Sequence, residues 1–430
     1  MPGVFGLRAY YEDWVNSTSR FIGYGLIGLQ HRGQESFGIV TAYDSKFKVY
    51  KCQKQARDAF DERKLGRIPG CVGIGAVSIY KEKNRKNVQP IIENGLALAY
   101  DGRFQLEDGA REFARMLGKE LERNQPEQAG ANAIEKVSGG YAFCALTKDG
   151  TIIFGRDKRG VKPLSHVGLG FDNGLVSSET CAFNVVGSKS PPQYVEPGEC
   201  YAISRYSKKK CKVETNDRKL CAFECVYLAN ILSKLDGFAI SAVRRRIGKR
   251  LAEKYPVSAD IVVGVPETAR PFALAYSNAT GIPVEEGFAR ILGERSAIKP
   301  TQFEREVGVQ LKLNPIREVT ARKNVIVIDD SVVRGTTVRK TFKFMRDYCG
   351  VKDLHLLVGS PKIVARCPYG TEVPGEDELI ARHLSDREIA EAIGADSIGF
   401  LTVEDLADCI GISLEELCTG CFTGKYQGED

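Results

Sequence analysis

The sequence of 430 residues contains no apolar run that approaches the length of a membrane-spanning helix. Its start also lacks the apolar core of a secretory signal peptide, because charges occur at Arg8, Glu12, Asp13 and Arg20. The 61 basic residues outnumber the 55 acidic ones only slightly, giving a net charge of +6 that is spread along the chain. A basic stripe for nucleic acid is therefore missing, although the mild excess suits an anionic substrate. We expect a cytoplasmic protein that contacts neither membrane nor nucleic acid.

Cysteine is missing from the start of the chain, since none of the 13 cysteines precedes Cys52. Disulfides are rare in reducing compartments, so this number favours buried thiols or metal ligands over a disulfide framework. The hydrophobic content of 43% and the charged content of 27% are ordinary for globular proteins. A chain of this length should form two domains with separate cores.

Residues 325–337 (VIVIDDSVVRGTT) combine a buried strand, two acids and a loop before a helix. The β-branched run 325–328 predicts a strand in a parallel sheet, and ligands bind beyond the carboxyl ends of such strands. Gly335 and the start of the helix predicted over 338–348 favour phosphate, whereas Asp329 and Asp330 suit sugar hydroxyls or Mg²⁺. The pattern indicates a phosphorylated ribose; the alternative is a buried strand ending in two solvated acids.

Two different arrangements of secondary structure are predicted for the two halves. The first half has short strands at 72–79 and 96–100, a hairpin from 142–146 to 151–154, and helices over 106–121 and 129–137. After a basic connection at 204–220, helices alternate with apolar strands, as in a doubly wound parallel sheet. The helix over 242–255 and the buried strand over 261–266 belong to that second pattern.

Several strings carry a resemblance to one family. They are 2–6 (PGVFG), 29–36 (LQHRGQES), 139–143 (GGYAF), 155–157 (GRD), 176–183 (VSSETCAF) and 325–337. The last resembles the phosphoribosyl-pyrophosphate (PRPP) motif of type I phosphoribosyltransferases, and together they resemble the glutamine PRPP amidotransferases of purine synthesis. The resemblance implies an α+β N-terminal-nucleophile-type domain with αββα layers over residues 1–215, which would be glutaminase-like. An α/β type I phosphoribosyltransferase domain with C-terminal helices would follow over 216–430.

The same resemblance assigns the residues that would bind PRPP and Mg²⁺. Glu267 and Thr268 would orient the pyrophosphate, and Arg295, in a lid at 290–302, would also contact it; a plain strand-to-helix turn is the alternative for 267–270. Ser296 would join the acids around Mg²⁺. The ribose and 5′-phosphate would be held by Asp329, Asp330, Ser331, Arg334, Gly335, Thr336 and Thr337.

The residues that perform glutamine hydrolysis in the family are replaced. Pro2 stands where the family has its nucleophilic cysteine. Ser78 stands where an arginine would hold the glutamine carboxylate, and Asp101 replaces the asparagine of the oxyanion hole. The family's Ser-Asp-Thr-Glu segment is deleted near 123–128, and Phe37 replaces an alanine. We expect an inactive glutaminase half, with His31, Arg32 and Asp157 as structural residues. Removal of Met1 would expose a secondary amine on Pro2, but a proline that starts a strand is the simpler interpretation.

Four cysteines match the ligands of a [4Fe–4S] cluster in the iron-sulphur subtype of the family: Cys221, Cys367, Cys418 and Cys421. The last two form a C-x-x-C pair, which supplies two thiolates on one turn. Zinc is the alternative for four thiolates, and a redox C-x-x-C is a third.

The expected function is an amidophosphoribosyltransferase that uses PRPP and ammonia, the ammonia being free or supplied by a separate amidase. By similarity the chain would form a homodimer or homotetramer and respond to purine nucleotide inhibitors. The match of residues 230–233 (NILS) to the family's Arg-Pro-Asp-Ser is poor. A non-catalytic regulatory subunit that senses PRPP or nucleotides is therefore the second hypothesis, and a transferase with another nucleophile is the third.

Overall fold

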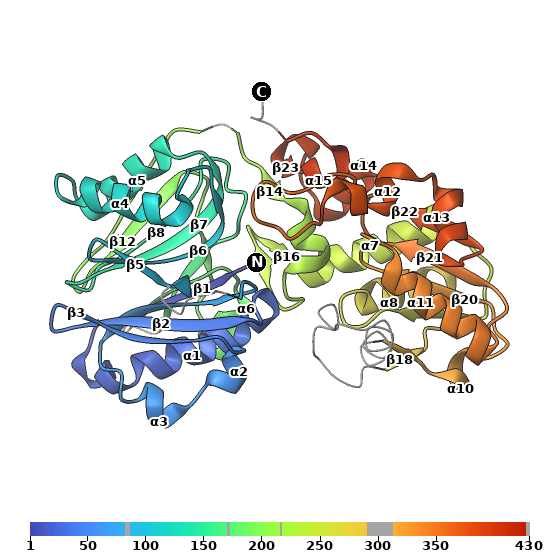
Figure 1. Ribbon diagram of the computed structural model, residues 1–430, viewed down its shortest axis with the longest axis horizontal. Coiled ribbons are helices and arrows are strands. Elements are labelled where there is room, and N and C mark those ends of the chain that lie inside the picture. The colour runs from blue at the N-terminus through green and yellow to red at the C-terminus, as the bar shows by residue number, and fades with distance from the viewer. Residues whose placement is uncertain (82–86, 170–172, 216, 290–312, 427–430) are drawn as a thin grey trace. The chain divides into compact units, whose positions relative to one another are not determined.

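The computed structural model describes residues 1–81, 87–169, 173–215, 217–289 and 313–426 (Figure 1). The chain divides into two compact units. The first comprises Met1–Cys221, Leu228–Ala239 and Pro368–Glu372, and the second comprises Ala222–Tyr227, Ile240–Cys367 and Val373–Asp430. The first unit therefore includes short segments from the second half of the sequence.

Two antiparallel sheets form the centre of the first unit (Figure 1). In the described residues, one sheet has the order β11 (Gln193–Tyr194), β9 (Ser165–Leu169), β10 (Asn173–Ser177), β1 (Gly3–Ala9), β4 (Val72–Ser78), β2 (Ser36–Tyr43) and β3 (Lys46–Cys52). The other has the order β13 (Lys208–Lys212), β12 (Glu199–Ile203), β8 (Ile152–Arg156), β7 (Gly139–Thr147), β6 (Leu96–Phe104) and β5 (Ile91–Glu93). β13 shows that the basic connection includes an edge strand.

Helices cover the outer faces of both sheets. Val4 and Ile74 of the first sheet meet Phe154 of the second in the core between the sheets. α1 (Thr18–Gly28) packs Ile22 and Leu26 against the outer face of the first sheet. α4 (Gly109–Leu121) and α5 (Pro126–Lys136) cover the second sheet, and α4 buries Ala110, Phe113, Ala114 and Leu117, a helical spacing of three and four residues. The predicted αββα layers are confirmed.

The second unit is a parallel sheet with helices on both faces. Its strand order is β17 (Ile261–Gly264), β20 (Val325–Asp329), β21 (Leu354–Val358) and β22 (Ser397–Phe400). Its principal helices are α7 (Ile240–Lys254), α8 (Arg270–Thr280), α11 (Thr336–Phe344), α13 (Asp386–Ile393), α14 (Val403–Ile410) and the short α15 (Gly420–Thr423).

Alternate residues of the central strand contact opposite layers of helices. Val325 and Val327 pack with Phe342 of α11 and with α13. On the other face, a Cβ added at Gly359, which follows β21, would lie 2.5 Å from Phe272 of α8. The predicted doubly wound pattern is confirmed. Among the described residues, no helix combines the length and apolar character needed to span a membrane.

Candidate functional site

The carboxyl ends of β17 and β20 place two loops side by side at one edge of the parallel sheet. Gly264 pairs with Ile328, and the backbone nitrogen of Val265 donates to the carbonyl of Ile328 at 2.8 Å. The loop with Glu267 and Thr268 therefore emerges next to the loop that begins at Asp329. The geometry brings together the two segments to which the sequence assigned the pyrophosphate and the phosphorylated ribose.

Asp329 and Asp330 form a close pair of carboxylates at this edge. The carboxylate of Asp329 accepts a hydrogen bond from the backbone nitrogen of Asp330 at 2.8 Å, and the hydroxyl of Ser331 donates to Asp330 at 2.6 Å. Burial, together with the charge of Asp330, raises the pKa of Asp329 well above its ordinary value. Two acids whose repulsion opposes ionisation suit a bound cation, because a cation stabilises both charged forms. The donor set therefore fits Mg²⁺.

The loop ends at a helix whose first residues are available to an anion. Gly335 precedes α11 with a φ of 68°, a left-handed conformation that favours glycine. Thr336 and Thr337 open the helix and are exposed. Free backbone N–H groups and the helix dipole at this end favour phosphate. Arg334 is also exposed, but its guanidinium forms an ion pair with Glu378 at 2.5 Å.

The loop that is predicted to bind pyrophosphate lies in a similar position, between the end of β17 and the start of α8. Glu267 is exposed, Thr268 is partly buried, and α8 begins two residues later at Arg270. Glu267 forms an ion pair with Arg270 at 3.1 Å, and Arg270 also contacts Glu286 at 3.0 Å. The lid residues Arg295 and Ser296 lie outside the described residues.

Sequence reasoning missed one polar residue at this edge. Ser360 follows β21 and is fully buried, and its hydroxyl has no hydrogen-bond partner among the described residues. The preceding Gly359 donates its backbone nitrogen to the carbonyl of Asp329 at 2.9 Å, so Ser360 lies near the carboxylate pair. The signal was available, because Gly-Ser follows the apolar run 354–358 directly.

Three of the four predicted cluster cysteines belong to the second unit. Cys418 ends β23 (Leu417–Cys418), and Cys421 lies in α15. The carbonyl of Cys421 accepts hydrogen bonds from the backbone nitrogens of Val364 and Ala365 at 2.8 and 3.2 Å, which places the segment leading to Cys367 beside α15. Cys221 belongs to the first unit.

At the start of the chain, Met1 and Pro2 are both buried. The sulfur of Met1 lies 3.4 Å from the Lys162 amine and 3.2 Å from the Thr371 hydroxyl, and Lys162 is itself fully buried. Burial lowers the pKa of the Met1 amine to about 5. Sequence reasoning missed the contacts of Lys162 and Thr371 with Met1, because no local pattern links residues so far apart in the chain.

The buried guanidinium of Arg32 contacts three residues close to the first strand. Its Nη2 donates to Asp101 at 2.7 Å, its Nη1 donates to Glu179 at 2.6 Å, and its Nε donates to the carbonyl of Pro2 at 3.1 Å. Asp101 is fully buried, and its second oxygen has no partner among the described residues. Ser78 is also buried, and its hydroxyl accepts the backbone N–H of Tyr80 at 3.2 Å.

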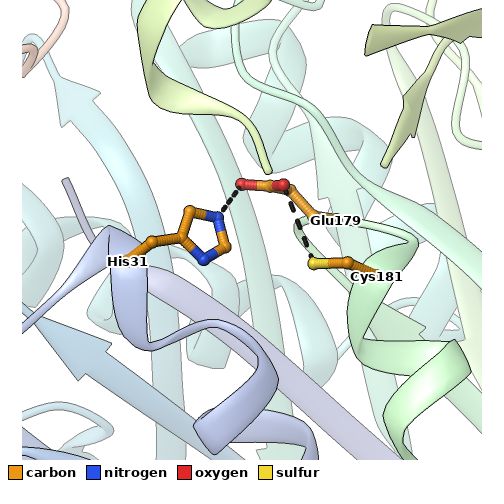
Figure 2. Close-up of side chains that lie close together, drawn as sticks. All are labelled: His31, Glu179 and Cys181. Atoms are coloured by element: carbon orange, nitrogen blue, oxygen red, sulfur yellow. Dashed lines mark hydrogen bonds and ion pairs between the residues drawn. The ribbon is translucent and has the colours of Figure 1, made fainter. Parts of the chain in front are cut away.

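Glu179 is the centre of a second set of contacts, and Figure 2 shows those with His31 and Cys181. One carboxylate oxygen lies 2.7 Å from His31 Nε2, and the other accepts from the Asn230 backbone nitrogen at 2.8 Å and the Ser233 hydroxyl at 2.7 Å. Burial alone would raise the pKa of Glu179, but the charges and hydrogen bonds of His31 and Arg32 hold it well below its ordinary value. Residues 230–233, which match the family poorly, thus supply two hydrogen bonds to this carboxylate.

His31, Glu179 and Cys181 lie close enough together to be considered as metal ligands. Two observations argue against a cation there. The positive guanidinium of Arg32 already occupies a Glu179 oxygen, and burial raises the pKa of the Cys181 thiol to about 12. A thiol that stays protonated is a poor ligand. We interpret the group as a hydrogen-bonded network.

Comparison with known proteins agrees with this architecture. No protein-family model matches the sequence. The chain is 36% identical to an amidophosphoribosyltransferase of Methanocaldococcus jannaschii, covering 100% of this chain and 98% of that protein. It is 36% identical to the amidophosphoribosyltransferase of Bacillus subtilis, covering 99% and 94%. The solved structure of glutamine PRPP amidotransferase from B. subtilis complexed with ADP and GMP aligns with a TM-score of 0.88 at 35% identity, over 99% of this chain and 97% of that one. A structure described as the allosteric regulatory enzyme of purine biosynthesis aligns with a TM-score of 0.89 at 35% identity, over 99% and 96%. The chain belongs to the amidophosphoribosyltransferase family.

Proposed function

We propose that the chain is an amidophosphoribosyltransferase of purine biosynthesis that uses ammonia and no longer hydrolyses glutamine. The reaction joins PRPP and ammonia to give 5-phosphoribosylamine and pyrophosphate. The observation that carries the transferase part is the pairing of β17 with β20, which sets the loop at Glu267 beside the loop at Asp329. This edge combines a carboxylate pair with a helix N-terminus, and a phosphorylated ribose needs both.

Each residue of the edge has a role in this reaction. Asp329 and Asp330 would hold the ribose hydroxyls and Mg²⁺, with Ser296 as a further ligand. Mg²⁺, when bound, neutralises the leaving pyrophosphate. Gly335, Thr336 and Thr337 would hold the 5′-phosphate together with Ser331 and Arg334; Glu267, Thr268 and Arg295 would orient the pyrophosphate. Ammonia arrives as a neutral nucleophile, so the reaction requires no general base.

Loss of the glutaminase is supported by the contacts of the replaced residues. Pro2 has no thiol, and its carbonyl accepts a hydrogen bond from Arg32. Asp101 is a hydrogen-bond acceptor buried against Arg32, whereas an oxyanion hole needs donors. Ser78 cannot form the bidentate ion pair that arginine makes with a carboxylate. Met1, which precedes Pro2, is only 5% exposed.

The cluster and the partners are proposed from the resemblance of the sequence to the family. We propose Cys221, Cys367, Cys418 and Cys421 as ligands of a [4Fe–4S] cluster, which would connect chain segments and take no part in the transfer; zinc is the alternative. Purine nucleotides are proposed inhibitors, because the B. subtilis relative was solved with ADP and GMP. A homodimer or homotetramer is the proposed assembly. Either free ammonia or a separate amidase would supply nitrogen.

One observation favours a second function, a regulatory subunit without catalysis. Arg334 pairs with Glu378, so its guanidinium is engaged away from the phosphate loop in this structure. Such a subunit would still bind PRPP through the helix N-terminus. A transferase that uses another nucleophile is a third candidate, since nothing in the loop itself selects ammonia.

The test is pyrophosphate release from PRPP and Mg²⁺, with ammonium chloride or glutamine supplied in parallel. We expect release with ammonium and none with glutamine. Release with glutamine would contradict our interpretation of Pro2, Ser78 and Asp101. Binding of PRPP without release under either condition would replace the transferase with the regulatory function.

A further inference from the structure

A buried arginine lies near the end of the first strand. Arg8 is only 8% exposed, and its Nη1 donates to the carbonyl of Gly150 at 2.9 Å. Among the described residues, this is the one acceptor for the five N–H donors of the guanidinium, and Nε is buried without a partner. Burial lowers the pKa of Arg8 from its ordinary value. A buried guanidinium is usually paired with a carboxylate, so the missing anion requires an explanation.

Arg8 lines a cavity of about 590 Å³, which lies within the size range of small-molecule sites. Lys148 and Arg205 also line it, as do the acids Glu12, Asp44 and Asp149. Glu12 is paired with Arg205 at 3.1 Å, and Asp149 accepts hydrogen bonds from the hydroxyls of Thr147 and Thr151. Asp44 is exposed on a turn. The acids are thus engaged or solvated. The charge of Asp149 partly offsets the lowering of the pKa of Arg8, but among the described residues no carboxylate forms an ion pair with it.

Aromatic residues form part of the cavity wall. Tyr10, Tyr11 and Tyr43 all line it. Tyr11 is 57% exposed and Tyr43 is 46% exposed, so both rings offer open surface to a ligand in the cavity. Tyrosine combines a flat apolar face with a hydroxyl, so it suits a ligand that is partly apolar and partly polar.

We propose that this cavity binds a small organic anion, whose carboxylate or phosphate pairs with Arg8 and whose flat body packs against the tyrosines. The planar guanidinium fork matches the oxygens of either group. The site differs from the glutaminase position at Pro2, because six residues of extended strand separate them, or roughly 20 Å. It does not depend on the proposed transferase activity.

Cys71 provides a reporter inside the cavity. It lines the wall and is partly exposed, so a bound ligand should shield its thiol from iodoacetamide. We would measure the alkylation rate of Cys71 at peptide level by mass spectrometry, with benzoate, phenyl phosphate or inorganic phosphate as probes at constant ionic strength. A local readout is needed because phosphate should also bind at the helix N-terminus of the second unit.

The expected result is slower alkylation of Cys71 in the presence of benzoate or phenyl phosphate, and the better probe identifies the anionic group. Arg8→Met should raise the half-protecting concentration at least about tenfold, a change of 1.4 kcal/mol. Lys148→Glu, an exposed change with little risk to folding, should raise it about threefold, as expected for a rim charge. Arg57→Gln is the matched control, because Arg57 is exposed and lies outside the cavity lining.

Two results would overturn the proposal. One is that no probe slows alkylation in the unmodified protein. The other is that protection is the same in Arg8→Met, or, if that variant fails to fold, the same in Lys148→Glu. Arg8 would then serve only to fix the β7–β8 turn through Gly150.

Discussion

Replacing Arg32 with methionine would remove one charge from the centre of the first unit and leave its aliphatic length in place. Arg32 is only 3% exposed and donates to Asp101, Glu179 and the carbonyl of Pro2. Two buried carboxylates would lose their cation. The substitution therefore measures how far this unit depends on one guanidinium.

The two carboxylates would lose different shares of their hydrogen-bond partners. Glu179 would keep hydrogen bonds from His31, Asn230 and Ser233, whereas Asp101 would keep no partner among the described side chains. Leaving one buried charge without its partner costs about 3–5 kcal/mol, and we expect Arg32→Met to lower the free energy of unfolding by that amount. Adding Asp101→Asn to Arg32→Met should recover about 2 kcal/mol, because the double variant no longer buries an orphaned charge.

Because the chain has a single tryptophan, tryptophan fluorescence can report the unfolding of the first unit by itself. Trp14 packs against Phe21 with ring centroids 4.7 Å apart, both in the first unit. Its fluorescence during urea unfolding therefore follows this unit and not the parallel sheet. An orphaned carboxylate binds a proton more readily in the folded state than in the unfolded chain, so stability is lost as pH rises. The destabilisation should accordingly be smaller at pH 5 than at pH 8.

The reasoning would be refuted if Arg32→Met lowered the free energy of unfolding by less than about 1 kcal/mol, because a loss that small is typical of substitutions at exposed positions. It would also be refuted if Asp101→Asn failed to restore stability. Arg57→Met serves as the control, because that side chain is 63% exposed and its one ion pair among the described residues is with exposed Asp58.

Four further predictions concern other parts of the chain. Asp329→Asn should raise the melting temperature of the metal-free protein, because burial and the charge of Asp330, which raise the pKa of Asp329, both oppose a charge at this position. It should also lower pyrophosphate release about 100-fold or more; unchanged release would remove Asp329 from the site. Gly335→Ala should destabilise the second unit about 1 kcal/mol more than Gly350→Ala, judged by circular dichroism, since both have φ near 69° but only the Cβ at 335 meets a side chain, at 2.9 Å; equal losses would count against the clash. Burial lowers the pKa of the Met1 amine to about 5 from 8.0, so the folded protein binds fewer protons between those values. The stability of the first unit should thus fall by up to about 4 kcal/mol as pH drops from 8 to 5; a flat profile by Trp14 fluorescence, in protein that mass spectrometry shows to retain Met1, would contradict this. Cys418→Ser should lower the iron content in elemental analysis of protein purified without oxygen, and zinc in place of iron would support the alternative metal.

Much of the second unit could be predicted because its information is local. Four consecutive β-branched residues and two acids indicated a buried strand and its functional end, and Gly335 indicated the turn before the helix. The structure confirms β20, α11 and the positive φ at Gly335. The same holds for the hairpin of β7 and β8, where Lys-Asp-Gly marks the turn.

The contacts around Arg32 could not be predicted in this way. Arg32, Asp101 and Glu179 are separated by about 70 to 150 positions; Asp101 lies in β6, and Glu179 lies between β10 and α6. Local periodicity predicts that a residue is buried, but it does not predict which distant residue forms an ion pair with it. His31 and Arg32 are predicted as structural loop residues; Arg32 is buried and His31 is exposed, and both contact the Glu179 carboxylate.

The first unit includes two segments from the second half of the sequence, and this affects how it forms during synthesis on the ribosome. Asn230 and Ser233 complete the surroundings of Glu179, and Thr371 contacts Lys162, yet all three are translated after the sheets of this unit. Domains are made at about 5–20 residues per second, so the 157 positions between 215 and 372 take roughly 8–30 s. The Lys162 amine lacks Thr371 for that whole interval, whereas the Glu179 carboxylate lacks its partners only until Ser233 is made. A fragment that stops at residue 215 would lack all three residues permanently, so a fragment must extend to residue 372 to include every segment of the first unit.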